Sequence, residues 1–246
     1  MIYKKPPETW QELQQKVHET FLMIGYDSQI TKTIKLVRGE KEVDVYAVNR
    51  LLKPEQLIIV ECKFWRSKIP QNEVHAFRTV VADCGANIGL LISNNGFQKG
   101  CNSAIEKTNI KLLDWESFNQ LYLQEYFIQK MLQTRKYFEL FTDYTEPINT
   151  RITKLVNSLP DNKKQLYDIL KKRYFGLGFI ITNYPYSMIC YKDDLSQYMN
   201  FPISIPIDCN EVDNINYISV YSVEEFFEII IKYHDKAMRE FQEVFG

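Results

Sequence analysis

Two carboxylates and one ammonium group stand where neighbouring strands of a sheet could bring them together. Asp44 lies in the alternating segment Val-Asp-Val-Tyr at 43–46, and Glu61 and Lys63 end the apolar run that starts at Leu57. Side chains at i and i+2 of a strand point to the same face, so Glu61 and Lys63 emerge together. If the two strands pair, Asp44 reaches the same edge. An acidic residue at the end of an apolar run is unusual, because a buried charge is costly without a partner.

Two neighbouring carboxylates repel each other, and a divalent cation relieves that repulsion. Mg²⁺ takes oxygen ligands and keeps several waters, so Asp44, Glu61 and the backbone carbonyl of Cys62 form a suitable ligand set, for Mn²⁺ as well. Such a cation activates water and neutralises charge at phosphorus. Lys63 can steady the phosphate or the water as a compact cation. The pattern predicts metal-dependent phosphodiester hydrolysis. The alternative is ordinary edge charges, since Glu-x-Lys alone is common.

The elements that must position these residues follow from the periodicity of the apolar side chains. Residues 8–24 are predicted to form an amphipathic helix, 29–37 and 43–48 a hairpin, and 57–63 a central strand. Helices at 70–83 and 97–107 alternate with strands at 88–93 and 110–113. Strands linked by helices at this spacing imply an α/β fold with a mixed sheet flanked by helices.

The rest of the chain is predicted to form a second, α+β domain. A long helical stretch runs from 115 to about 141, and helices are expected at 161–174 and 223–244. Strands are expected at 175–182 (FGLGFIIT) and 216–222, with irregular chain at 185–210. We therefore divide the chain into a first domain at 1–118, a connecting helix at 119–150 and a C-terminal domain at 151–246.

Composition limits the classes of protein that the sequence can encode. Hydrophobic residues make up 45% of the 246 residues, which favours a folded protein over a disordered one. No apolar run suits a membrane span or a signal peptide, so we expect a cytoplasmic protein. The five cysteines lack CxxC spacing and are expected to be reduced thiols. Residues 1–115 carry 16 Lys and Arg against 13 Asp and Glu, a mildly basic balance that is compatible with phosphate contacts.

Several segments occur in the order that is typical of one nuclease family. They are a helix ending in Ile-Gly-Tyr at 24–26, VDVYA at 43–47, IIVECK at 58–63, Val74 and Phe77 in the next helix, GLLIS at 89–93, Gly96 and Phe97 opening a helix, and IKLL at 110–113. With these segments, residues 13–118 resemble the catalytic domain of Mrr-type (type IV) restriction endonucleases in the PD-(D/E)xK nuclease superfamily.

The resemblance implies roles for individual residues and for the whole protein. Asp44 and Glu61 would be metal ligands, and Lys63 would be the family's lysine. The substrate would be DNA, often modified or foreign, in restriction or anti-phage defence. Such enzymes often act as dimers, for which the hydrophobic stretch 122–141 could supply an interface, and a partner protein of a defence system is another option.

One position departs from the family pattern. The family often has an acidic residue in the first helix, where this sequence has Gln14. Glu12 and Glu19 fall nearly opposite the apolar stripe of that helix and are expected to be solvated. Gln14 could serve as a neutral oxygen at the site, or water could replace it. This departure leaves room for a rival interpretation, in which the fold is catalytically weak, or gated by a partner or signal, and binds DNA or a protein.

Further polar residues are weaker candidates for the same site. Trp65, Arg66 and Lys68 could contact phosphate or stack on a base, or form a solvated loop. Gln71, Glu73 and His75 occupy the next helix, where most surface side chains have no catalytic role. His18 is expected to be structural. The turn at 93–96 could offer N–H groups to a phosphate or simply cap a helix.

Overall fold

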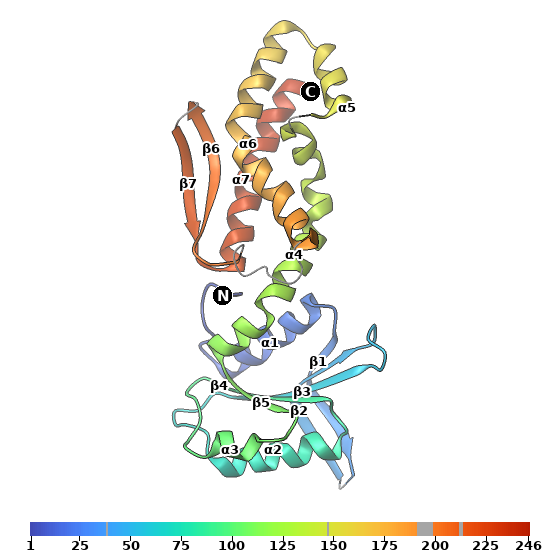
Figure 1. Cartoon of the computed structure of the whole chain (residues 1–246), viewed down its shortest axis with the longest axis vertical. Coiled ribbons are helices and arrows are strands. Elements are labelled where there is room, and N and C mark those ends of the chain that lie inside the picture. Colours follow the sequence, from blue (N-terminus) through green and yellow to red (C-terminus); the bar gives the residue numbers. More distant parts are fainter. Residues whose placement is uncertain (38, 147, 191–198, 212–213) are drawn as a thin grey trace. The chain divides into compact units, whose positions relative to one another are not determined.

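The computed structural model describes residues 1–37, 39–146, 148–190, 199–211 and 214–246. They form two compact units, one of residues 5–129 and the other of residues 1–4 together with 130–246. The long helix α4 (Trp115–Thr145) contributes to both units. Figure 1 traces the chain through these elements.

The first unit contains a mixed sheet of five strands, as the sequence predicts. Its strands are β1 (Asp27–Leu36), β2 (Gly39–Asn49), β3 (Gln56–Lys63), β4 (Ile88–Ser93) and β5 (Ile110–Asp114), in the order β1-β2-β3-β4-β5. β1, β2 and β3 pair antiparallel, whereas β3, β4 and β5 are parallel. The parallel strands need crossovers, and the helices between them supply these.

Helices cover both faces of this sheet (Figure 1). α1 (Trp10–Met23) starts at Thr9, whose side chain accepts a hydrogen bond from the Glu12 N–H, and it buries Val17 and Phe21. The ring of Phe21 meets Phe118 at the start of α4. The opposite face carries α2 (Gln71–Asp83) and α3 (Cys101–Ile105). α3 is shorter than the predicted helix at 97–107.

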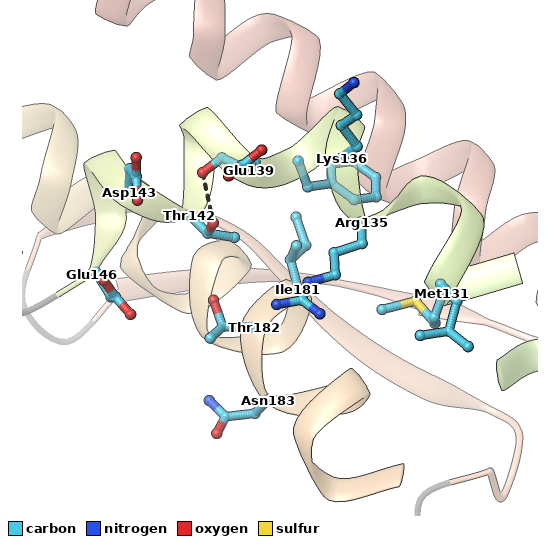
Figure 2. Close-up of a pocket in the computed structure, with 12 residues that line it drawn as sticks. Met131, Arg135, Lys136, Glu139, Thr142, Asp143, Glu146, Ile181, Thr182 and Asn183 are labelled. Atoms are coloured by element: carbon cyan, nitrogen blue, oxygen red, sulfur yellow. Dashed lines mark hydrogen bonds between the residues drawn. The ribbon is translucent and has the colours of Figure 1, made fainter. Parts of the chain in front are cut away.

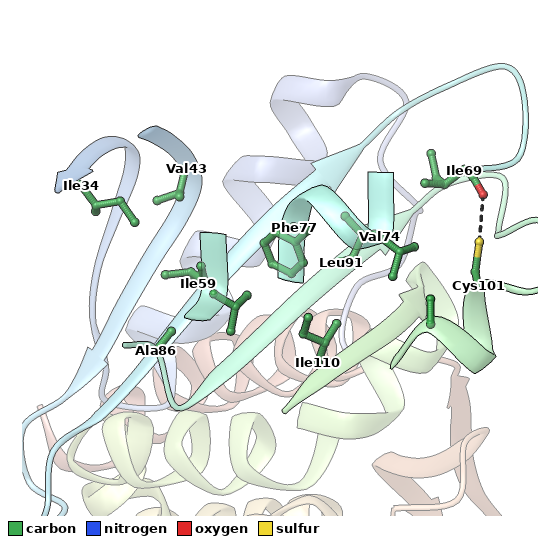
Figure 3. Packing of buried hydrophobic residues seen from close by; sticks show 12 residues of the cluster. Ile34, Val43, Ile59, Ile69, Val74, Phe77, Ala86, Leu91, Cys101 and Ile110 are labelled. Atoms are coloured by element: carbon green, nitrogen blue, oxygen red, sulfur yellow. Dashed lines mark hydrogen bonds between the residues drawn. The ribbon is translucent and has the colours of Figure 1, made fainter. Parts of the chain in front are cut away.

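The core beneath α2 fixes the carboxyl end of β3 (Figure 3). Ile59 of β3 and Leu91 of β4 pack with Val74 and Phe77 of α2, and all four are nearly or fully buried. Deleting any of these side chains would leave a cavity that costs about 2–5 kcal/mol. The packing therefore holds the first turn of α2 beside the end of β3.

The pairing of β1 with β2 has an irregularity at Thr31 and Asp44, which we call the bend. The pairing register runs through Ile30↔Val45 and resumes at Lys32↔Val43, so the pair between them is interrupted. Thr31 has φ +51°, a left-handed conformation that β-branched residues rarely adopt. On the hairpin side of the bend, Ile34 and Val43 pack in the core with residues of α2 (Figure 3). Asp44 thus lies at the bend, next to this core.

The described residues of the second unit form helices and one pair of strands. It contains α5 (Thr150–Asn157), α6 (Asp161–Cys190), β6 (Ile203–Glu211), β7 (Asn214–Val220) and α7 (Val223–Phe245), in addition to the second half of α4. The N-terminus belongs here as well, since the Met1 carbonyl accepts a hydrogen bond from the Val223 N–H. The predicted last strand and last helix are confirmed, and α5 was not foreseen.

Two predictions for this unit are wrong. The segment at 175–182 is not a strand, because α6 continues through it to Cys190. The stretch 185–210 is not irregular throughout, since it contains the end of α6 and most of β6, while residues 191–198 and Pro147 lie outside the described residues. The apolar run at 175–182 gives no periodicity that separates a strand from a buried helix. Tertiary packing decides for the helix.

Two glycines allow α6 to pack closely against β6 and α4. A Cβ at Gly176 would lie 2.9 Å from the Pro206 Cβ of β6, and one at Gly178 would lie 2.6 Å from the Thr145 Cβ of α4. Both values are far below van der Waals contact. The missing side chains let α6 approach its neighbours closely, which compensates for the weak helix propensity of glycine.

We predict that Gly178→Ala destabilises the protein although alanine favours helices. The added methyl group would clash with Thr145, which is itself buried, and overpacking of this kind costs about 1–3 kcal/mol. Urea unfolding measures the loss. Gln165→Ala, which introduces alanine at an exposed position of the same helix, is the control. A Gly178→Ala protein at least as stable as wild type would contradict the packing.

A cavity of about 700 Å³ lies in the second unit, between α4 and α6 (Figure 2). Arg135, Glu139 and Thr142 of α4 line it, with Ile181 and Thr182 of α6. None of the sequence-predicted site residues belongs to it. In the described part of the chain, no helix is long and apolar enough to cross a membrane. Four of the five cysteines are seen as free thiols, namely Cys62, Cys84, Cys101 and Cys209.

Candidate active site

Strand pairing brings the three predicted residues together at the carboxyl end of β3. The antiparallel register Val45↔Val60 places Asp44 opposite Glu61 when it is extended by one residue. Glu61 and Lys63 share one face of β3, as their spacing requires. The electrostatic interactions of Asp44 with both Glu61 and Lys63 agree with this placement.

Lys63 lies between two carboxylates. Its Nζ is 2.8 Å from Oε1 of Glu61 and 3.4 Å from Oε2 of Glu73, which extends from the first turn of α2. The side chains of Glu61 and Lys63 are only 14% and 17% exposed, so solvent screens their pairing weakly. Burial alone lowers the pKa of Lys63, but the hydrogen bonds and charges of Glu61 and Glu73 outweigh it, and the pKa is raised. Lys63 is therefore a firmly protonated cation.

Asp44 is held by the backbone of the neighbouring strand. Its Oδ2 accepts a hydrogen bond of 2.6 Å from the Cys62 N–H. Burial raises the pKa of Asp44 to about 6, with a further contribution from the charge of Glu61, while the Cys62 N–H, Lys63 and Lys41 oppose the shift. The ionised carboxylate is thus under-compensated, and a cation at this place would relieve it.

Gln14 supports the backbone at the bend. This buried residue of α1 donates from Nε2 to the Asp44 carbonyl oxygen at 3.0 Å and contacts Oγ1 of Thr31 at 3.4 Å. The pairing of β1 with β2 is interrupted at this position, so the side-chain amide takes the place of a strand partner. Gln14 thereby holds the peptide group of Asp44 in the geometry of the bend.

We predict that Gln14→Glu destabilises the metal-free protein. An ionised carboxylate cannot donate to the Asp44 carbonyl, and it would add a third negative charge near Asp44 and Glu61. Loss of a buried hydrogen-bond partner costs about 1–3 kcal/mol. Urea unfolding in EDTA at pH 7.5 measures this, with Gln11→Glu on the exposed side of α1 as the control. If Gln14→Glu is as stable as wild type, the amide does not hold the bend.

Sequence reasoning missed Trp10, the first residue of α1. Its indole Nε1–H donates to the Cys62 carbonyl oxygen at 3.0 Å. This is the oxygen that the sequence suggests as a metal ligand. A carbonyl oxygen has two lone pairs, so one stays available beside the indole. No local sequence pattern predicts this contact, because 52 residues separate the two partners.

The oxygen atoms at this end of β3 would suit a hard divalent cation that keeps most of its waters. Asp44 and Glu61 could offer carboxylates, and the Cys62 carbonyl a neutral oxygen. Within the described residues, no group of three or more His, Cys, Asp or Glu side chains gathers as a ready-made metal cage. Mg²⁺ is usually held by one or two carboxylates with waters and substrate oxygens, so a smaller protein set fits it.

The weaker candidates lie around this cluster or away from it. Trp65, Arg66 and Lys68 are exposed just beyond β3, and Gln71 and His75 are exposed on α2. His18 contacts the Ser28 hydroxyl through Nδ1 at 2.9 Å, which agrees with a structural role. The turn at 93–96 does not cap a helix, because α3 begins only at Cys101.

Comparison with known proteins finds one matching protein family. Residues 8–122 match the family model described as "Restriction endonuclease", of the Mrr catalytic type. No curated protein matches the chain.

Three solved structures are similar over part of the chain. One is a protein of unknown function, AF1548 (18% identity, 42% of this chain and 57% of that one, TM-score 0.38). The second is the protein VC1899 from Vibrio cholerae (18%, 46% and 32%, TM-score 0.35). The third is the MspJI restriction endonuclease in complex with a 27-mer oligonucleotide (16%, 52% and 33%, TM-score 0.28).

The matches span between 32% and 57% of those proteins. All three TM-scores are low, so the assignment rests on the family model and on the sheet that carries the segments matched by it. Residues 8–122, a little under half of the chain, are therefore similar to the restriction endonuclease family of the Mrr catalytic type.

Proposed function

We propose that this protein is a metal-dependent endonuclease that hydrolyses DNA phosphodiester bonds with Mg²⁺ or Mn²⁺. The observation that carries the proposal is the convergence of Asp44, Glu61 and Lys63 at the carboxyl end of β3, with the pKa of Asp44 raised to about 6. An under-compensated carboxylate, a second carboxylate beside it and a protonated lysine are what a phosphodiesterase site requires. A structural ion pair would need only Glu61 and Lys63.

Each residue has a distinct part in this proposal. Asp44 and Glu61 bind the cation, with the Cys62 carbonyl as a third oxygen. The cation, when bound, lowers the pKa of water and neutralises charge at the scissile phosphate. Lys63 contributes a fixed positive charge to the phosphate oxygens or orients the attacking water. Glu73 keeps the Lys63 ammonium in place while Glu61 turns toward the cation, because it offers a second anchor at 3.4 Å.

Gln14 has a supporting part. Its amide fixes the Asp44 peptide, and the buried position suits a role in shaping the ligand set. The acidic residue that the family often has in this helix is thus replaced by a group that stabilises the bend. We propose that the site keeps its preference for Mg²⁺ or Mn²⁺ and binds the metal less tightly than a three-carboxylate site would.

The wider setting is proposed from the family. Restriction or anti-phage defence in the cytoplasm is the expected role, with a homodimer or a partner protein completing the active form. Residues 151–246 would supply specificity or regulation.

One assay tests the central proposal. The purified full chain is incubated with supercoiled plasmid, linear duplex and single-stranded DNA in Mg²⁺, Mn²⁺ or EDTA. Cleavage is expected only with a divalent cation. DNA that stays intact in every metal, with wild type and Asp44→Asn equally inactive, would support a binding module of nuclease fold instead.

A further inference from the structure

The segment that follows the proposed catalytic strand is fixed in place although it lies on the surface. We call residues 64–69 the strap. The Trp65 N–H donates to Oδ1 of Asn94 at 2.8 Å, and Nδ2 of Asn95 donates to the Arg66 carbonyl at 2.7 Å. Two successive asparagines of the turn after β4 therefore bind backbone groups of two successive strap residues.

The far end of the strap is anchored in the same way. The Ile69 N–H donates to the Gly96 carbonyl at 3.0 Å, and the Ile69 carbonyl accepts from the Gln98 N–H at 2.9 Å. Nε2 of Gln98 also reaches the Lys68 carbonyl at 3.4 Å. Ile69 is fully buried and makes a bridge with Phe97. Backbone groups of four of the six strap residues, namely Trp65, Arg66, Lys68 and Ile69, are thus hydrogen-bonded, which is more order than a solvated loop needs.

The side chains on this ordered backbone have the chemistry of a nucleic-acid contact. Trp65 is 38% exposed, large for an indole, and Arg66 and Lys68 are exposed as well. The Lys63 ammonium lies over the Trp65 ring at 5.5 Å from its centroid. The ring is therefore next to the group that would contact the scissile phosphate. A base stacked on it would belong to a nucleotide beside the bond to be cut.

We propose that the strap is a binding site for an unpaired nucleotide, with Trp65 stacking on its base and Arg66 and Lys68 contacting the flanking phosphates. This rests on the proposed nuclease function and names its substrate class as DNA with a single-stranded or unstacked nucleotide at the cleavage position. An indole needs an accessible base face, and the interior of a duplex offers none. The rigid strap lets Trp65 stack with little loss of conformational entropy.

Binding is measured with the full-length Asp44→Asn protein in EDTA, so that cleavage plays no part. Fluorescence anisotropy compares a labelled single strand, the blunt duplex of the same sequence and a duplex with one unpaired nucleotide. Trp65→Ala should weaken binding of the single strand and the interrupted duplex about 10-fold, since stacking is worth about 1–3 kcal/mol per base. Binding of the blunt duplex should change less than about two-fold. Trp65→Phe, which keeps a ring, should restore most of the affinity.

The two cations are tested by salt dependence. Arg66→Gln with Lys68→Gln should weaken binding of all three DNAs and reduce the slope of log affinity against log salt by about 1 to 2. The matched control replaces Lys53 and Lys111 by Gln, which removes the same charge from exposed positions away from the carboxyl end of β3. This control should change the slope clearly less.

The inference is overturned if Trp65→Ala weakens the blunt duplex as much as the single strand, or changes neither. It is also overturned if the control pair reduces the salt slope as much as the strap pair. The outcome is separate from that of the cleavage assay. A protein that never cuts DNA but shows the Trp65 pattern would refute the nuclease function alone, and a nuclease without the pattern would refute the strap alone.

Discussion

Replacing Lys63 with alanine should eliminate DNA cleavage while leaving the fold intact. Lys63 is a protonated group beside the proposed metal ligands, paired with Glu61 at 2.8 Å. Removing one preorganised group that stabilises the transition state lowers the rate about 100- to 1,000-fold. The loss of Lys63 would also leave Glu61, a proposed metal ligand, without its ion-pair partner. Single-turnover cleavage with Mn²⁺ measures the effect.

Folding and specificity of the Lys63 effect need separate controls. Circular dichroism and thermal unfolding in EDTA should show a folded protein, because the side chain lies at the end of β3 and does not belong to the apolar core. Lys111→Ala removes an exposed lysine from β5 of the same sheet and should keep cleavage within about two-fold of wild type. A purified Lys63→Ala protein that still cuts DNA would refute the assigned mechanism.

Replacing Asp44 with asparagine should abolish saturable binding of Mg²⁺ and Mn²⁺, and with it cleavage. The asparagine oxygen can still accept the hydrogen bond from the Cys62 N–H, so the bend in the sheet is kept. The substitution removes the negative charge of one of the two proposed carboxylate ligands, and the site has few other oxygen ligands from the protein. Calorimetric titration with Mn²⁺ should show an affinity at least about 100-fold weaker.

Asp27→Asn is the matched control, because Asp27 is an exposed carboxylate at the start of β1 that pairs with Arg50. Its metal affinity should equal that of wild type. Unchanged Mn²⁺ binding by Asp44→Asn would place the metal elsewhere, or show that the fold binds none.

Without metal, the stability of wild type and that of Asp44→Asn should depend differently on pH. Folding raises the pKa of Asp44 to about 6, chiefly through burial, above the value of about 4 in an unfolded chain. The native state therefore holds this proton more tightly. The stabilisation is complete below about pH 4 and is lost as the pH rises through 6. Relative to Asp44→Asn, wild type should lose about 1–3 kcal/mol between pH 4 and 7.

Urea unfolding in EDTA at several pH values checks this difference, and the comparison cancels groups that both proteins share. Adding Mn²⁺ at pH 7 should restore stability to wild type alone, since a ligand that binds only the native state stabilises it. An equal pH dependence of both proteins would show that Asp44 is not under-compensated.

Much of the fold of the first unit can be predicted from the sequence alone, because short-range patterns of side chains determine its strands and helices. The period-two alternation of a strand is sufficient to place Glu61 and Lys63 on one face, and the apolar run at 57–60 marks β3 as a central strand. The order of strands and helices then limits the topology to a mixed sheet. Asp44 lies beside Glu61 as soon as β2 and β3, the strands that flank the connection at 50–55, pair antiparallel.

Only the tertiary structure decided the features that depend on contacts between distant residues. The left-handed Thr31, the amide of Gln14 on the Asp44 carbonyl and the indole of Trp10 on the Cys62 carbonyl form one cluster, and no local pattern encodes it. The helix at 175–182 depends likewise on the fit of Gly178 against Thr145. Propensity and periodicity describe a segment by itself, whereas close packing and buried hydrogen bonds choose among the conformations that the segment allows.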